Sequence, residues 1–189
     1  MNQDPTRRWR LETLEGCQLA IGAYPLFRYD ARGGGGTAVA ATGKAPPTGD
    51  TGVVPLAFAP EQLRIPALSG RTTTVLGLPL PPGLSITVVP MRLEGEVDPD
   101  GGSVALAFEA AFRFRLRLGG VTLLAPPDLQ IRTCLRSGSP LSPTGATTLL
   151  GVATVPPCGA PWLDRFLGLP NQALAVLQCR LSPEPNGIL

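Results

Sequence analysis

The strongest pattern in the chain is an alternation of apolar and polar positions across residues 104–118. Polar positions at Glu109, Arg113, Arg115 and Arg117 fall between even-numbered positions that are all apolar. These apolar positions are Val104, Leu106, Phe108, Ala110, Phe112, Phe114, Leu116 and Leu118. Successive side chains of a β-strand point to opposite faces, so this period of two predicts a long strand with one buried face and one wet face.

The segment before this strand predicts its hairpin partner. Apolar or small residues occupy the odd-numbered positions there, and charged residues lie between them. The apolar or small residues are Met91, Leu93, Gly95 and Val97. If the Asp-Pro-Asp-Gly-Gly sequence at 98–102 turns tightly on residues 100 and 101, paired positions sum to 201. Leu93 then faces Phe108 on the apolar side, and Arg92 faces Glu109 on the wet side. A slip of one residue would set Leu93 against Glu109, so the matching of hydrophobic faces fixes the register.

Further short segments that alternate or are rich in β-branched residues predict the rest of a sheet. Gly/Pro-rich turns separate them, which is typical of an all-β sandwich or barrel. The fold class is therefore predicted as all-β, an antiparallel barrel or barrel-like sheet of about 8–10 strands. The candidates are residues 9–14, 17–23, 25–30, 71–76, 85–89, 129–135 and 147–155. Residues 85–89 are expected to run on into Met91 through a kink at Pro90.

One short C-terminal helix is predicted over residues 161–168, since Pro161 suits a first helical turn and Gly168 suits a helix end. Trp162 and Phe166 would share one side of it. They are core residues if the helix plugs a barrel mouth, the favoured interpretation, or an exposed aromatic patch if it stands off the surface. Residues 172–181 fit either a helix or a closing strand, and both remain open.

The length of 189 residues predicts a single domain over residues 1–189. Four consecutive glycines at 33–36 open a Gly/Pro-rich stretch, and residues 33–52 are predicted to form a flexible loop. Residues 182–189 are predicted to be a loose tail.

Net charge and hydropathy limit the classes of binding partner that the sequence supports. The net charge is +2, which is too balanced to indicate nucleic acid. No apolar run is long enough for a membrane-spanning helix, and no signal-peptide pattern follows the first residues, so a cytoplasmic location is expected. Peripheral contact with a membrane remains open.

Candidate catalytic groups are few. The chain has no histidine and no GxSxG motif, and its four cysteines form no CxxC pair, so we expect no metal, no cofactor and reduced, mostly buried thiols. Glu94 and Glu96 share a face at a spacing compatible with glycosidase-like chemistry, but they are predicted on the wet side of a hairpin, away from a cleft. The sequence therefore predicts a protein that is not an enzyme.

The apolar face suggests a different role. A closed sheet of about eight strands either fills its centre or holds one small apolar ligand. A filled core, a ligand cavity and a protein-docking face are all open. The candidate ligand-binding residues are Phe108, Phe112, Phe114, Met91, Leu93 and Ile86. The candidate partner-binding residues are Trp162, Phe166, Arg113, Arg115 and Arg117, although a row of arginines also fits a solvated outer face.

Two segments carry a resemblance. The first covers residues 78–115, which have a proline-rich start and the turn at 98–102. The second covers residues 156–169, which contain Pro-Trp-Leu-Asp-Arg-Phe-Leu-Gly-Leu from 161. Both segments are similar to uncharacterised β-rich proteins of cyanobacteria. The resemblance carries over no site residue, but a phototrophic source implies a pigment or lipid partner. The leading hypothesis is non-enzymatic binding or carrying of a hydrophobic small molecule, such as a lipid, isoprenoid or pigment. The alternative is a structural or assembly factor that docks on a protein partner, for example of the photosynthetic apparatus.

Overall fold

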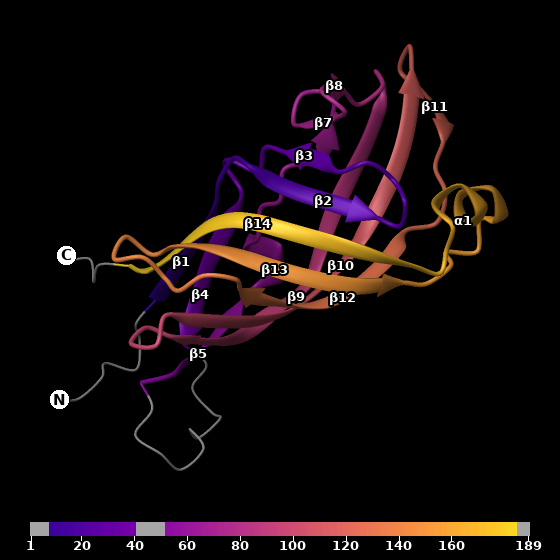
Figure 1. Cartoon of the computed structure of the whole chain (residues 1–189). Coiled ribbons are helices and arrows are strands. Elements are labelled where there is room, and N and C mark those ends of the chain that lie inside the picture. The colour runs from indigo at the N-terminus through magenta and orange to yellow at the C-terminus, as the bar shows by residue number, and fades with distance from the viewer. Residues whose placement is uncertain (1–7, 41–51, 185–189) are drawn as a thin grey trace.

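The computed structural model describes residues 8–40 and 52–184, and its centre is a ring of eight antiparallel strands (Figure 1). The last strand pairs back with the first, which closes the ring. In ring order the strands are β1 (Arg8–Thr13), β4 (Gly35–Ala40), β5 (Val54–Phe58), β9 (Leu84–Asp98), β10 (Ser103–Leu118), β12 (Leu129–Ser137), β13 (Ala146–Val155) and β14 (Asn171–Pro183). The predicted all-β, barrel-like architecture is confirmed.

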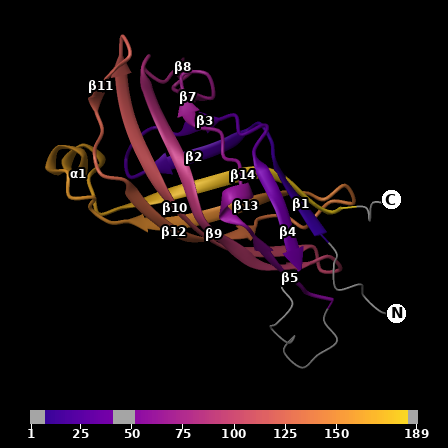
Figure 2. The same cartoon turned by 180° about the vertical axis from the view of Figure 1, so that it is seen from behind.

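Shorter strands extend the sheet beyond the ring. A branch runs from β14 through β2 (Cys17–Ile21), β3 (Phe27–Tyr29), β7 (Thr73–Val75) and β8 (Leu78–Pro79). The short strand β6 (Leu68–Ser69) pairs with β9, and β11 (Val121–Leu124) folds back on β10. One turn of 3-10 helix, η1 (Pro60–Gln62), follows β5. Both views place β8, β11 and the helix α1 (Pro161–Leu167) at the end of the molecule away from the chain termini, which we call the distal end (Figures 1 and 2).

The β9–β10 hairpin has the predicted register over its first half. Leu93 pairs with Phe108, and Arg92 pairs with Glu109 at 3.5 Å between guanidinium and carboxylate. The connection is longer than the predicted two-residue turn, because pairing stops at Asp98 and Ser103. The Asp98 carboxylate accepts hydrogen bonds from the backbone N–H groups of residues 100 and 101, at 3.1 and 2.8 Å. This side-chain contact holds the wider loop without changing the register.

A β-bulge at Met91 changes the hairpin beyond this point. Pairing shifts between Glu109 and Ala110, so that Met91 has no partner between Arg92 and Pro90. The extra residue changes the parity of the buried positions from even, as at Val88, to odd, as at Leu93. Met91 is therefore 46% exposed, and the prediction that it faces the interior is wrong.

The glycine run opens strand β4, which corrects the predicted flexible loop over residues 33–52. Residues 35–40 form a strand that pairs with both β1 and β5, while residues 41–51 lie outside the described part of the chain. A Cβ at Gly34 would lie 2.4 Å from Thr13 Oγ1, and one at Gly36 would lie 2.9 Å from a Leu63 methyl carbon. These glycines allow close packing of neighbouring segments.

The C-terminal third resolves the alternatives left by the sequence. The helix α1 forms as predicted and ends at Gly168, which has a left-handed backbone. It buries Leu163 and Leu167 but leaves Trp162 50% and Phe166 61% exposed, so the favoured core interpretation of the two aromatics is wrong. The helix lies beside the ring opening and turns its aliphatic stripe inward, which leaves the aromatic side outside.

Residues 172–181 belong to strand β14 rather than to a helix. The strand extends past them to Pro183, and Ser182 and Pro183 pair with Arg10 and Trp9 of β1. The predicted loose tail over residues 182–189 is therefore wrong at its start, and residues 185–189 lie outside the described part. The backbone of residues 182 and 183 pairs with β1 to close the ring, which explains why these residues form a strand and not a loose tail.

Three clusters of buried side chains form the core. One lies inside the ring around Leu56, Leu106, Leu149 and Leu181. A second lies between β2, β3 and the first half of β9, and a third joins α1 to β12 and β13. Among the described residues, no helix has the length and apolar content needed to cross a bilayer.

Candidate functional site

An apolar cavity of about 230 Å³ runs between these clusters. Its walls come from the inward faces of β1, β9, β10, β12, β13 and β14, together with β2, β3 and the segment over residues 63–68. The inner side chains of one wall alternate along β14 as Ala173, Ala175, Leu177 and Cys179. The small side chains on this strand leave room opposite the phenylalanines of β10, so the ring is not filled to its centre.

Most of the predicted ligand-binding residues lie together on the cavity wall. Phe108, Phe112 and Phe114 project from β10, and Leu93 and Ile86 project from β9. Phe108 packs against the first two clusters, and Phe112 packs against the second and third. The phenylalanines therefore line the cavity along its length. Met91 is the exception, because the bulge turns it outward.

The polar side chains of the wall bind to backbone carbonyls. Thr13 donates its hydroxyl to Ala31 O at 2.6 Å, and Thr133 donates to Val152 O at 2.8 Å. The Tyr29 hydroxyl donates to Pro66 O, and the Cys179 thiol to Thr147 O. Arg64 is the one charged residue among the wall residues, and it is exposed. The wall thus offers a ligand hydrocarbon contacts, since its neutral donors are already used.

Burial keeps the inner titratable groups of the wall region neutral. It raises the pKa of the Tyr29 phenol, with smaller effects from Cys17 and Asp30. It also raises the pKa of the Cys17 thiol, and it raises that of Cys179 to about 12, with a smaller effect from Cys17. At neutral pH these groups carry no charge, which suits a cavity for uncharged chain segments.

The cysteines differ in access, which gives a direct test of this burial. Cys134 is exposed on β12, whereas Cys17 and Cys179 are 0% and 1% exposed. We expect a maleimide to label Cys134 in the native protein and to label Cys17 and Cys179 only in denaturant, because the thiolate reacts and the buried thiols hold their protons. Mass spectrometry of tryptic peptides measures the labelling. Equal labelling rates at Cys17 and Cys134 would contradict the described core.

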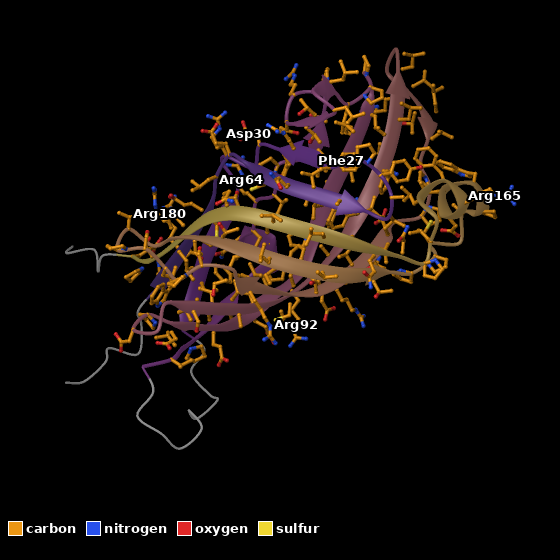
Figure 3. The ribbon with its side chains drawn as sticks, viewed as in Figure 1. Phe27, Asp30, Arg64, Arg92, Arg165 and Arg180 are labelled. Carbon is orange, nitrogen blue, oxygen red and sulfur yellow. The ribbon has the colours of Figure 1, made fainter. Side chains whose placement is uncertain are left out.

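The outer face of the β9–β10 hairpin is an ion-pair network. Glu109 lies 3.5 Å from Arg92 and 3.4 Å from Arg132, and Arg92 also pairs with Glu94. Figure 3 shows Arg92 pointing outward from the ring. Glu94 therefore lies on an exposed wall, away from the cavity. Across the described residues no group of three or more His, Cys, Asp or Glu side chains is placed to hold a metal ion.

The predicted arginine row divides in two. Arg113 forms an ion pair with Asp128 at 3.0 Å. Arg115 and Arg117 donate instead to backbone carbonyls, at Phe114 O (3.5 Å) and Gly120 O (3.3 Å). Figure 1 places α1, which carries the exposed Trp162 and Phe166, at the same distal end as the β10–β11 hairpin. Partner binding by this set stays a prediction.

Sequence reasoning missed several wall residues. Residues 63–68 cross the cavity between η1 and β6, where Gly35 and Arg64 exchange two backbone hydrogen bonds of 2.8 Å. The alternation of Leu63 and Ile65 with polar neighbours was a signal for this segment, but Pro66 after them indicates a turn. Tyr29 was missed because its neighbours along the chain do not alternate long enough to predict a face.

Comparisons with known proteins add no relative to this geometry. No protein-family model, no curated protein and no solved structure matches the chain. The resemblance to cyanobacterial proteins therefore stays an expectation, and function is argued from the cavity and the surface alone.

Proposed function

We propose that the protein binds a hydrophobic small molecule in the cavity of its β-ring and carries it without chemical change. The observation that supports this most is an apolar cavity whose neutral polar wall groups are bound to backbone carbonyls. A filled core would place side chains in this space, because protein interiors pack closely. Hydrocarbon that fills the retained space stabilises the complex by about 0.8 kcal/mol for each CH₂ removed from water.

The volume narrows the ligand class. About 230 Å³ exceeds the ~150 Å³ that holds benzene in an engineered protein cavity, and it is below the ~300 Å³ at which drug-sized pockets begin. The proposal is therefore a single acyl or isoprenoid chain that enters with its apolar end, while a polar head stays outside.

A cavity-filling substitution tests the proposal. Ala175 lies on the wall between Gly151 of β13, which has no side chain, and Leu19 of β2. A larger side chain at 175 therefore has room on the β13 side. We expect Ala175→Phe to weaken binding of the fluorescent fatty acid cis-parinaric acid by at least about tenfold, because the ring occupies the volume that the chain needs. Fluorescence titration measures the Kd.

Val152→Phe is the matched control, since Val152 lies on the neighbouring strand with 60% of its surface exposed. This variant adds the same ring outside the cavity and should bind like the wild type. Circular dichroism and urea unfolding check that both variants fold. Absence of probe binding by the wild type, or equal Kd values for Ala175→Phe and Val152→Phe, would reject the cavity as a ligand site. Native mass spectrometry after mild purification should show co-purifying apolar mass on the wild type and less on Ala175→Phe.

A further inference from the structure

Exposed apolar side chains gather at the distal end on three separate projections. The β7–β8 hairpin carries Leu76 and Leu78, the β10–β11 hairpin carries Leu118 and Val121, and α1 carries Trp162 and Phe166. Figures 1 and 2 place these three elements at the distal end. The exposed fractions of the six side chains range from 50% to 80%. We call these six residues the distal patch. Single exposed apolar residues are common on protein surfaces, but pairs of them on three projections at the same end of the molecule indicate an interaction site.

Leu76 provides a second, independent observation. Residues 76 and 77 form a two-residue hairpin loop in which both backbones have positive φ, +52° and +81°. Glycine, asparagine and aspartate are favoured at both positions of such a turn, and a leucine there is strained. Leu76 nevertheless is 80% exposed, so packing within the fold does not explain its presence. A strained and exposed side chain at a tip indicates a role outside the folded chain.

The charges near the distal patch are positive. Residues 110–127 contain three arginines and no acidic residue, but Asp128 follows them and pairs with Arg113, which leaves Arg115 and Arg117. Within the described part of the chain no carboxylate pairs with Arg115 or Arg117. Arg165 points away from the sheet at the outer end of α1 (Figure 3). The carboxylate of its neighbour Asp164 accepts hydrogen bonds from the backbone N–H groups of Cys158 and Gly159, at 2.8 and 3.2 Å.

We propose that the distal patch docks the protein on an anionic phospholipid surface. Apolar side chains at the tips of projections can enter the headgroup region, while arginines beside them contact lipid phosphates, and tryptophan favours this interface. A protein partner would need a surface shaped to three separated tips, whereas a bilayer adapts to them. This inference does not depend on the proposed function, since docking and cavity binding use different residues.

Vesicle co-sedimentation of the full chain tests docking. We expect the wild type to bind vesicles of equal parts phosphatidylcholine and phosphatidylserine, and to bind phosphatidylcholine vesicles at least about tenfold less. Arg115→Gln/Arg117→Gln should remove most of this difference, as should high salt. Leu76→Asn should weaken binding to both vesicle types several-fold while keeping or raising the Tm, because asparagine suits the left-handed backbone. A structural role for Leu76 would instead lower the Tm.

Met91→Asn is the matched control, because Met91 is an exposed apolar residue on the β9 wall, away from the distal patch. It should bind vesicles like the wild type. A wild type that stays in the supernatant with anionic vesicles would overturn the proposal. So would a Leu76→Asn variant that binds as well as Met91→Asn, or a wild type that forms dimers by light scattering in place of binding vesicles. The cis-parinaric acid titration, done without vesicles, reports on the cavity separately.

Discussion

Gly35→Ala is expected to lower the free energy of unfolding by about 4 kcal/mol or more. Gly35 has a φ of +123°, and a Cβ at this position would lie 1.9 Å from the carbonyl oxygen of Leu11. The clash is with backbone, so a side-chain shift cannot relieve it. Relief requires β4 to move away from β1, which opens the ring, and also breaks the hydrogen bonds of Gly35 with Arg64 at the cavity wall. Urea unfolding followed by circular dichroism measures the loss.

Gly33→Ala is the control for this prediction. Gly33 also has a positive φ, +83°, but no atom lies within 4 Å of the added Cβ. The substitution should therefore cost only the backbone strain, about 1 kcal/mol. If both variants lose the same stability, close contact between β1 and β4 is not the reason for glycine at residue 35.

Leu106→Ala is the second variant with a large expected effect, a loss of about 2–5 kcal/mol. Leu106 is 0% exposed and pairs with Gly95 on one side and Leu135 on the other, in the middle of the ring cluster. Shortening this side chain removes apolar contacts and leaves a cavity that the closed ring cannot collapse around. Urea denaturation with the m-value compared with that of the wild type measures the effect.

Leu118→Ala makes the same chemical change on the same strand and face. Leu118 is 67% exposed, because β10 has passed beyond the ring at this point. Its substitution should change the free energy of unfolding by less than about 0.5 kcal/mol. A large loss at Leu118, or none at Leu106, would show that the even-numbered face of β10 is not buried as described.

The register of the first half of the β9–β10 hairpin could be predicted because its information is local. A long alternation on each strand and a turn sequence between them are enough to set the register, and Leu93 pairs with Phe108 as expected. The helix α1 was predictable for the same reason, since Pro161 and Gly168 mark its ends within one short segment. Most predicted ligand-binding residues lie on the cavity because they belong to this hairpin.

The bulge at Met91 and the strand β4 show where local patterns were insufficient. Apolar residues before Pro90 fall at even positions, Ile86 and Val88, whereas Leu93 after it falls at an odd position. Either a kink or an extra residue accounts for this change of face. The pairing with β10 decides for the extra residue. The glycines at 34–36 read as a flexible stretch, because the segments that crowd them, around Thr13 and residues 63–64, are distant in sequence.

The sequence by itself determined that the chain is a β-protein, that residues 104–114 turn their even-numbered side inward, and that Trp162 and Phe166 share one side of a short helix, because side-chain periodicity follows directly from backbone geometry. The tertiary structure decided which strands close the ring, which side of α1 faces water, and that the centre of the ring holds a cavity. These features depend on pairings such as β1 with β14, between residues far apart in the chain. They also depend on the summed volume of side chains from many strands, which no single segment encodes.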